Sequence, residues 1–460
     1  MILIDDTIAA IATAPGEGGI GIVRLSGNDA YKILGTIFVA GKNKALEEYS
    51  QRSMIYGHIY DDDKVVDEVL AVYMKGPNTY TREDIVEINC HGGFISVKKI
   101  LELCLRKGAR LSDRGEFTKR AFLNGRIDLS QAEAVMDIIG AKTDKAYNIA
   151  QNQLEGGLSS RIKDLRFKVT EMLAHIAVAL DFPEEDAPEL TYDSLLKGSN
   201  EIREGLDLLY KTSETGKIMR DGLRTVIVGR PNVGKSSLLN AILKESRAIV
   251  TNIPGTTRDV IEEMVNLRGI PLRIVDTAGI RETEDVVEKI GVEKSKQFLD
   301  IADLVIMMLD SSQTLTEEDL EIMESIQEKK ALILINKVDL EQKIDEEKIR
   351  SILPDKEIIK ISAQEGHGLI ELENSIENMV YTGEIKAESD VMVTNVRHRE
   401  AIEKAIESCE DAIRAINEKI HLEFIEVDIK NIWDYLGEVT GDTVSEDLLD
   451  TIFSQFCIGK

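Results

Sequence analysis

A glycine-rich loop with one lysine and one serine at fixed spacing offers the clearest chemistry in this chain. Residues 229–236 read GRPNVGKS, after an apolar segment at 225–228 and before a helical pattern at 237–242. Glycines let backbone N–H groups turn inward around a β-phosphate, at the positive end of the following helix. Lys235 would neutralise the β- and γ-phosphate oxygens, and the Ser236 hydroxyl would bind Mg²⁺. The pattern therefore predicts a site for a nucleoside triphosphate.

Four further segments follow in the order expected of a GTPase. GTTRD at 255–259 supplies the Thr257 hydroxyl for Mg²⁺, and DTAG at 276–279 places a carboxylate behind the metal. In NKVD at 336–339, the Asp339 carboxylate can accept hydrogen bonds from both guanine N1–H and N2–H in a partly buried pocket. Adenine would leave this carboxylate unpaired, so GTP is preferred over ATP. Ser362 and Ala363 follow another strand, and the Ala363 N–H can reach guanine O6. Together the five segments resemble the Ras-like GTPase superfamily.

The catalytic group of such enzymes is missing. Ile280 stands where Ras-type enzymes carry the glutamine that orients water, and isoleucine cannot hydrogen-bond to water. Another group must do so, and the acidic candidates are Glu282, Glu284, Asp285 and Glu288. The charge that develops at the β–γ bridge could be met by an internal arginine or by a monovalent cation that Asn232 helps to hold; the candidate arginines are Arg230, Arg258 and Arg281.

Length and composition narrow the class of protein. A chain of 460 residues predicts two or three domains, and 43% hydrophobic residues with 8 prolines is typical of a helix-rich globular protein. Two acidic residues near the start stand where a signal peptide needs basic ones, and no stretch is apolar enough to span a bilayer. We therefore expect a cytoplasmic protein without a membrane partner. Its four cysteines lie far apart and should be reduced.

The net charge of −27 opposes binding to nucleic acid, so RNA contact needs a local basic patch or a basic partner. One basic run exists between Lys98 and Arg126, where nine basic residues accompany three acidic ones. Two interpretations remain open for it. The run could form solvated helix and loop faces, or it could be a landing site for phosphates or an acidic ligand tail.

The pattern along the chain predicts a multidomain protein with α+β and α/β parts. Residues 1–118 mix strand and helix signals, and 119–215 and 385–460 are helical, with a capping box expected at 130–133. Residues 218–380 alternate apolar strands with helices, which predicts a parallel sheet in a P-loop G domain inserted into the helical domain. Long helices are expected at 146–179, 393–416 and 422–453.

Several segments spread from end to end of the chain are typical of one family. They are DTIAAIATAPGEGGIGIVRLSG (6–27), DIVEINCHGG (84–93), GEFTKRAFLN (115–124), DLSQAE (128–133), GRPNVGKSSLLN (229–240), DTAGIRETEDVVEKIG (276–291) and CIGK (457–460). Through these segments the whole chain resembles the MnmE (TrmE) family of tRNA-modification GTPases, among the TrmE-Era-EngA-like GTPases.

This resemblance implies an N-terminal domain (1–118) that binds folate and dimerises, a helical domain (119–215 with 385–460) whose CIGK tail reaches the folate site, and the G domain (218–380). It also implies a homodimer that works with the FAD-containing partner MnmG on tRNA. The pair would add an aminomethyl or carboxymethylaminomethyl group to C5 of the wobble uridine. The one-carbon unit would come from 5,10-methylene-tetrahydrofolate, for which a 5-formyl analogue can stand in. Glycine and ammonium both remain open as the nitrogen donor.

The resemblance also supplies residues for each ligand. It implies that G domains pair with GTP and K⁺ bound, that K⁺ is held by Asn232, Thr251, Ile253 and Thr256, and that Glu288 positions water. The implied folate residues are Arg24, Glu87, Arg126 and Lys460, with Cys457 as a candidate catalytic thiol. Arg126 stands where other members can have lysine, and Arg82 stands where glycine is usual. The complete set expected to bind GTP is Asn232, Val233, Gly234, Lys235, Ser236, Ser237, Thr251, Asn252, Ile253, Pro254, Gly255, Thr256, Thr257, Asp276, Thr277, Ala278, Gly279, Asn336, Lys337, Asp339, Ser362 and Ala363.

Two other classes of GTPase compete with this interpretation. Ribosome-assembly GTPases of the Era or Der kind share the phosphate loop, but they normally carry a basic RNA-binding domain and do not explain 1–118 or CIGK. A membrane-remodelling GTPase would need a basic amphipathic helix or a lipid anchor, which the sequence lacks. A tRNA-modifying GTPase therefore explains the sequence best.

Overall fold

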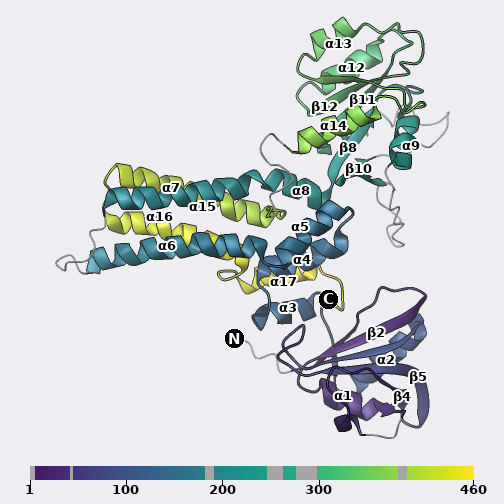
Figure 1. The fold of residues 1–460 in the computed structure, drawn as a ribbon, viewed down its shortest axis with the longest axis vertical. Helices are drawn as coiled ribbons and strands as arrows, with labels where there is room; N and C mark the ends of the chain where they lie inside the picture. The colour runs from purple at the N-terminus through teal and green to yellow at the C-terminus, as the bar shows by residue number, and fades with distance from the viewer. Residues whose placement is uncertain (1–5, 42–44, 182–190, 246–262, 276–297, 382–390) are drawn as a thin grey trace. The chain divides into compact units, whose positions relative to one another are not determined.

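The computed structural model describes residues 6–41, 45–181, 191–245, 263–275, 298–381 and 391–460 (Figure 1). The chain divides into two compact units. The first unit joins Met1–Met136 to Gly437–Lys460, and the second unit is Asp137–Leu436. The two ends of the chain thus belong to one folded body.

A seven-stranded sheet forms the centre of the first unit, in the order β3-β4-β5-β6-β2-β1-β7. Its pairs are antiparallel except for the parallel pair β1–β7. Its strands are β1 (Ile8–Ile11), β2 (Gly18–Ser26), β3 (Phe38–Ala40), β4 (Ile55–Asp61), β5 (Lys64–Met74), β6 (Ile85–Gly92) and β7 (Arg110–Leu111). Its helices are α1 (Ala30–Ile37), η1 (Leu46–Glu48), α2 (Phe94–Arg106), α3 (Glu116–Leu123), the start of α4 (Leu129–Gly140) and α17 (Glu446–Ser454).

Alternation along the strands sets the two faces of this sheet. Val86, Ile88 and Cys90 of β6 are buried in the core that α1 and α2 cover. Because successive side chains of a strand point to opposite faces, Glu87 of β6 lies on the second face, as does Arg24 of β2. The second face therefore carries the polar residues of this unit's candidate site.

The start of α4 differs from the sequence expectation. Asp128, rather than Ser130, precedes the helix, and its Oδ1 accepts a 3.1 Å hydrogen bond from the Gln131 N–H. Gln131 Oε1 in turn accepts from the Asp128 N–H at 3.0 Å, which completes a capping box two residues earlier than Ser130–Glu133. The predicted box was wrong because the segment DLSQAE contains two overlapping matches to the pattern.

Two predicted long helices are each divided by a glycine. The helix expected at 146–179 is α5 (Asp144–Leu154) followed by α6 (Gly157–Asp181), and Gly156 between them has φ 94°. The helix expected at 422–453 is α16 (Leu422–Thr440) followed by α17, with Gly441 at φ 90° between them. A left-handed residue ends a helix, and glycine adopts this conformation without a steric cost.

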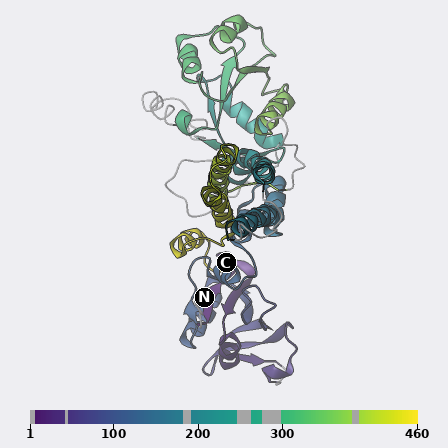
Figure 2. The same cartoon turned by 90° about the vertical axis from the view of Figure 1, so that its left-hand side faces the viewer.

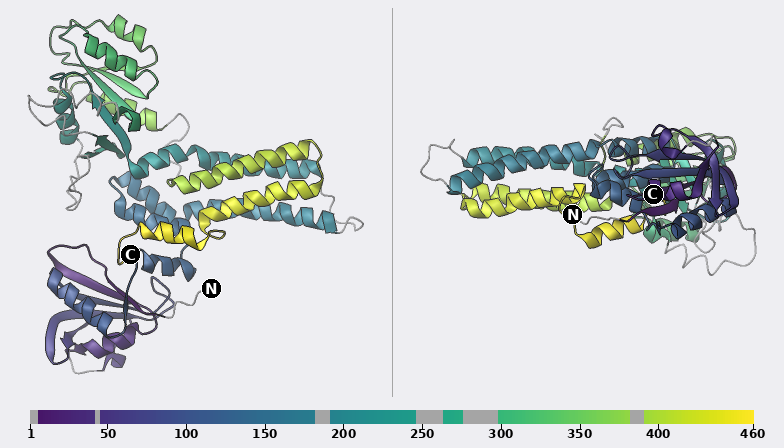
Figure 3. Two further views of the ribbon diagram at one scale, coloured as in Figure 1. Left: turned by 180° about the vertical axis from the view of Figure 1, so that it is seen from behind. Right: turned by 90° about the horizontal axis from the view of Figure 1, so that it is seen from below.

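The second unit contains long helices and a second sheet. The long helices are α6, α7 (Tyr192–Lys211), α15 (Val396–Asn417) and α16, and the shorter α8 (Ser213–Asp221) follows α7. The four long helices lie side by side in Figure 1 and in the left view of Figure 3, and Figure 2 shows them end-on. Asn395 caps α15 by accepting a 3.0 Å hydrogen bond from the Arg397 N–H.

The second sheet has six strands in the order β13-β12-β11-β8-β10-β9. All its pairs are parallel except β10–β9, which form a hairpin. Arg268 and Gly269 make the hairpin turn, both with positive φ, as a two-residue type I′ connection requires. The strands are β8 (Leu223–Val228), β9 (Glu263–Leu267), β10 (Ile270–Val275), β11 (Leu304–Asp310), β12 (Ala331–Asn336) and β13 (Glu357–Lys360); the helices are α9 (Lys235–Glu245), α12 (Glu317–Ser325), α13 (Glu346–Ile352) and α14 (Leu369–Val380).

The predicted fold class, with α+β, helical and α/β parts, is confirmed. The exact domain limits predicted from the sequence remain a prediction. Among the described residues, no helix combines the length and the apolar character that a membrane crossing requires.

Candidate functional sites

The phosphate loop lies between β8 and α9, and its two glycines are required by its geometry. Gly229 has φ 142°, and a Cβ there would come within 2.4 Å of the Met308 carbonyl oxygen. Gly234 has φ 108°, and a Cβ there would come within 2.1 Å of Asn336 Nδ2. Neither contact is compatible with a larger residue. The loop therefore packs tightly against the ends of β11 and β12, where a phosphate-binding loop belongs.

Lys235 extends over this loop. Its Nζ donates to the carbonyl oxygen of Gly229 and, at 3.0 Å, to that of Arg230. Ser236 and Ser237 follow in the first turn of α9 and are exposed. A cation and hydroxyls thus meet at one helix start, as phosphate and Mg²⁺ binding require.

Asn336 connects the loop to a segment predicted to recognise the guanine base. Its Nδ2 donates a 2.8 Å hydrogen bond to the Val233 carbonyl, and its Oδ1 accepts a 3.0 Å hydrogen bond from the Ala363 N–H. The N–H expected to reach guanine O6 is therefore bonded to Asn336 in this structure. The sequence analysis expected a partly buried pocket around the Asp339 carboxylate, whereas Asp339 is exposed in this structure.

Lys337 makes a second connection, through a residue that the sequence analysis missed. Its backbone is left-handed, with φ 64°, and its Nζ donates to the Asn232 carbonyl at 2.8 Å and to Asp310 Oδ2 at 2.6 Å. Asp310 ends β11 and is only 2% exposed. An aspartate directly after a fully apolar strand was the signal that could have found it.

Asn232 and Arg230 differ in their surroundings. Asn232 is exposed and left-handed, with φ 62°. Arg230, a candidate internal finger, forms a 2.9 Å ion pair with the fully buried Asp319 of α12. This arginine is therefore occupied by a structural contact.

Several predicted residues lie outside the described part of the chain. These are Thr251, Asn252, Ile253, Pro254, Gly255, Thr256, Thr257, Asp276, Thr277, Ala278, Gly279 and Glu288, with the candidate fingers Arg258 and Arg281.

The first unit brings three of the four expected folate residues, Arg24, Glu87 and Lys460, into one region. Arg24 and Glu87 are direct partners in the β2–β6 register, and Arg24 Nε donates to Glu87 Oε1 at 2.8 Å. The Arg24 guanidinium also lies 5.8 Å from the centre of the Phe117 ring. The N–H of Phe117 donates to the Lys460 carbonyl at 3.2 Å. Phe117 thus links the Arg24–Glu87 pair to the end of the chain.

The C-terminal tail lies along the start of α3. Arg114 and Ile458 form an antiparallel bridge, and the Gly115 N–H donates to the Cys457 carbonyl at 3.3 Å. Gly459 has φ 87°, and a Cβ there would come within 2.2 Å of the Ile11 carbonyl. The tail is therefore seated against β1, and the Cys457 side chain is exposed.

Arg126 and Arg82 border this region. The Arg126 guanidinium stacks 4.7 Å from the centre of the Tyr80 ring, whose hydroxyl lies 2.9 Å from Thr118 Oγ1. Arg82 has a left-handed backbone with φ 63°, and its Nη1 donates to the Asn124 carbonyl at 2.8 Å. This conformation explains why glycine is the residue expected at position 82.

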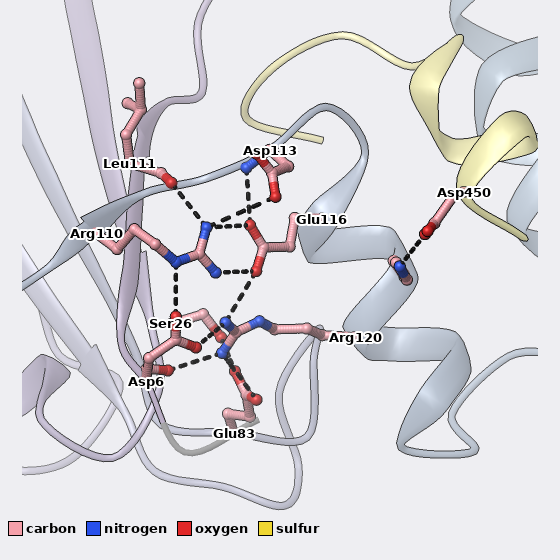
Figure 4. A network of polar contacts seen from close by, with 10 residues as sticks. Asp6, Ser26, Glu83, Arg110, Leu111, Asp113, Glu116, Arg120 and Asp450 are labelled. Atoms are coloured by element: carbon pink, nitrogen blue, oxygen red, sulfur yellow. Dashed lines mark hydrogen bonds and ion pairs between the residues drawn. The ribbon is translucent and has the colours of Figure 1, made fainter. Parts of the chain in front are cut away.

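Several basic residues of the run between Lys98 and Arg126 are paired with carboxylates of the same protein. Arg106 pairs with Asp61, and Lys119 pairs with Asp450. Figure 4 shows Arg110 and Arg120 inside a network of carboxylates, and Arg120 is only 1% exposed. Burial alone would lower the pKa of Arg120, but the charge of Glu83 and hydrogen bonds to nearby carboxylates outweigh it, so its pKa is raised. Much of this positive charge is therefore neutralised within the protein.

Comparison with known proteins identifies the family. A family model described as "MnmE helical domain" matches residues 129–457, and one described as "GTP-binding protein TrmE N-terminus" matches residues 7–126. The tRNA modification GTPase MnmE of Clostridioides difficile is 62% identical over 100% of both chains. That of Bacillus subtilis is 50% identical, over 99% of this chain and 100% of its own.

Among solved structures, Era of Aquifex aeolicus bound to GDP·AlF4⁻ matches with 30% identity and a TM-score of 0.28, over 40% of this chain and 66% of its own. The curated MnmE relatives match this chain from end to end, so the match includes residues 1–118 and the CIGK tail as well as the phosphate loop. The chain belongs to the MnmE family of tRNA-modification GTPases.

Proposed function

We propose that GTP binds with its phosphates in the loop 229–234 and its guanine beside Asp339, and that the hydroxyls of Ser236 and Thr257 would hold Mg²⁺. The tight seating of Gly229 and Gly234 supports the placement of the phosphates. Hydroxyl and phosphate oxygens are the hard ligands that Mg²⁺ prefers. The remaining predicted GTP-binding residues would complete the site.

Titration with a fluorescent GTP analogue, with and without Mg²⁺, tests this placement. Lys235→Ala should weaken binding by at least about a hundredfold, because it removes a charge-assisted contact to the phosphates. Lys348→Ala, which removes an exposed lysine of α13, is the matched control and should bind normally. Equal affinities in the two variants would contradict the assignment.

Hydrolysis is proposed to use K⁺ and a pair of G domains in a homodimer. K⁺ would be held by Asn232 with Thr251, Ile253 and Thr256, and Glu288 would position the water that Ile280 cannot. The exposed, left-handed Asn232 supports this, as does the engagement of Arg230 by Asp319. A bound monovalent cation can offset the charge that develops at the bridge oxygen.

The cation requirement is tested by GTP hydrolysis in K⁺ and in Na⁺ at matched ionic strength. The wild type should be much faster in K⁺, and Asn232→Ala should lose this difference. Asn240→Ala, which changes an exposed asparagine of α9, should keep it. Equal rates of the wild type in both salts would contradict the role of K⁺.

Folate is proposed to bind on the second face of the first unit's sheet. The Phe117–Lys460 hydrogen bond next to the Arg24–Glu87 pair is the observation that supports it most. A carboxylate such as Glu87 can accept from pterin N–H groups, and cations such as Arg24 and Arg126 can pair with the carboxylates of a folate. Cys457, exposed on the same tail, is the candidate reactive thiol.

Calorimetric titration of the intact protein with 5-formyl-tetrahydrofolate tests the folate site. Arg24→Ala should weaken binding, whereas Arg106→Ala, which removes an exposed arginine paired with Asp61, should not. No measurable binding to the wild type would remove the folate assignment.

The complete activity is proposed to require the FAD-containing partner MnmG. Together the two proteins would add an aminomethyl or carboxymethylaminomethyl group to C5 of the wobble uridine, with 5,10-methylene-tetrahydrofolate as the one-carbon source. Mass spectrometry of tRNA from cells that lack this protein should show an unmodified wobble uridine. An unchanged nucleoside would contradict this assignment.

A further inference from the structure

An ion network around the buried Arg120 of the first unit has no role in the function described so far. Its centre is Arg120 of α3, whose Nη2 donates to Asp6 Oδ1 at 2.6 Å and to Glu116 Oε1 at 2.9 Å. Its Nη1 donates to the Asp6 carbonyl at 2.9 Å and lies 3.2 Å from both carboxylate oxygens of Glu83. One planar guanidinium thus holds three carboxylates from distant parts of the sequence, as Figure 4 shows.

The network ties the first turn of α3 to the sheet. Glu116 is the first residue of α3 and also accepts from Arg110 of β7, at 2.6 Å and 3.1 Å. Glu83 accepts a 2.6 Å hydrogen bond from the hydroxyl of Ser26, the last residue of β2. Arg24, the proposed folate residue, lies two positions earlier on β2. The network therefore reaches both the strand of Arg24 and the helix that carries Phe117.

The same turn of α3 holds the C-terminal tail. Phe117 directly follows Glu116, and its N–H is bonded to the Lys460 carbonyl. Gly115 directly precedes Glu116, and its N–H is bonded to the Cys457 carbonyl. A Cβ at Gly115, where φ is 65°, would come within 2.8 Å of Phe456 Cβ. The position of the tail Cys457–Lys460 therefore depends on the position of the first turn of α3.

We propose that Arg120 is a positioning residue, whose network fixes the first turn of α3 and thereby holds the tail Cys457–Lys460 and the Phe117 ring beside Arg24. The expected effect on folate binding rests on the proposed folate function, whereas the expected effect on the placement of the tail does not. Loss of the network should release the tail and weaken folate binding, while Arg24 and Glu87 themselves stay unchanged.

Arg120→Lys is the sharpest test, because lysine keeps the positive charge but cannot reach three carboxylates with one planar fork. Amide hydrogen exchange would be followed at Gly115 and Phe117, whose N–H groups make the two bonds to the tail. Exchange there should accelerate about tenfold or more, with no change in β6, which would show local opening rather than global unfolding. The Kd for 5-formyl-tetrahydrofolate should rise about tenfold.

Two further variants complete the design. Arg106→Lys makes the same change at an exposed ion pair and should alter neither exchange nor affinity. Glu83→Gln removes one carboxylate and leaves Arg120 in place, so it should raise the exchange rates and the Kd in the same direction but by less. This variant keeps the proposal testable if Arg120→Lys does not fold.

The outcomes separate the two proposals. Unchanged exchange at Gly115 and Phe117 in a folded Arg120→Lys protein would overturn the positioning role, and so would equal acceleration in β6. Faster exchange at these two amides, in a protein whose wild type binds no folate, would support the positioning of the tail and reject the folate site.

Discussion

The side-chain amide of Asn336 donates a 2.8 Å hydrogen bond to the backbone carbonyl of Val233, so the end of β12 supports the phosphate loop directly. Asn336 also accepts from the Ala363 N–H, and it is only 3% exposed. One buried amide therefore sets the spacing between the phosphate loop and the segment expected to recognise guanine.

Replacing this residue should affect stability and nucleotide binding together. Asn336→Ala leaves the Val233 carbonyl and the Ala363 N–H without a partner, which should lower the free energy of unfolding by about 1–3 kcal/mol. GTP affinity should fall at least tenfold, which corresponds to about 1.4 kcal/mol. Urea unfolding and titration with a fluorescent GTP analogue measure the two effects. Asn200→Ala, an exposed helical position on α7, is the control and should change neither by much.

Gly234 should not tolerate alanine. A Cβ there would meet Asn336 Nδ2 at 2.1 Å, and φ is 108°, a conformation that side chains rarely adopt. Gly234→Ala should therefore abolish measurable GTP binding and lower the melting temperature. Gly140→Ala is the control: Gly140 is the last residue of α4, and a Cβ there would have no atom within 4 Å. Because alanine favours a helix more than glycine does, this change should stabilise the protein by about 0.5–1 kcal/mol. Normal GTP binding by Gly234→Ala would show that the loop geometry is not required.

Asp310 should contribute to the acid sensitivity of the second unit. Burial alone would raise the pKa of its carboxyl, but hydrogen bonds from Lys337 and from Ser312 outweigh it and lower the pKa below the ordinary value of 3.8. Because the folded-state pKa is the lower one, this stabilisation is present above pH 3.8 and is lost as the pH falls through the folded-state pKa.

The measurement is the free energy of unfolding as a function of pH. The difference between the wild type and Asp310→Asn should be largest near neutral pH and should shrink as the pH falls below about 3.8. Asp300→Asn, at an exposed residue that pairs with Lys329 at 3.1 Å, is the control and should show almost no difference at any pH. A difference for Asp310→Asn that is constant with pH would reject this explanation.

Arg82 should accept glycine at little cost. The left-handed conformation costs an arginine about 1–2 kcal/mol, which Gly removes, but the change also loses one hydrogen bond to Asn124 and adds freedom to the unfolded chain. The free energy of unfolding should therefore stay within about 1 kcal/mol of the wild type. Arg82→Val should be clearly destabilising, because β-branched residues tolerate positive φ poorly. Similar stability of the valine and glycine variants would mean that φ does not matter at this position.

The sequence by itself determined the local features. A phosphate loop is made of consecutive residues, so its glycines, lysine and serine could be recognised from their spacing. The apolar segment 225–228 marked where the loop begins. The sequence also supplied the order of the five GTPase segments and the fold class. Errors arose where two local signals competed, as at Asp128 and Ser130, or where a single glycine such as Gly441 ended a pattern.

Tertiary structure decided which charges meet. Glu116 lies four residues before Arg120 on α3, within reach of a helix spacing rule, but no such rule could bring Asp6 and Glu83 to Arg120. Ion pairs between distant segments depend on how the strands and helices pack. For the same reason the basic run looked like a surface patch in the sequence, whereas burial and pairing neutralise much of it in the fold. Arg24 and Glu87 are 63 residues apart along the chain and become neighbours only through the antiparallel register of β2 and β6.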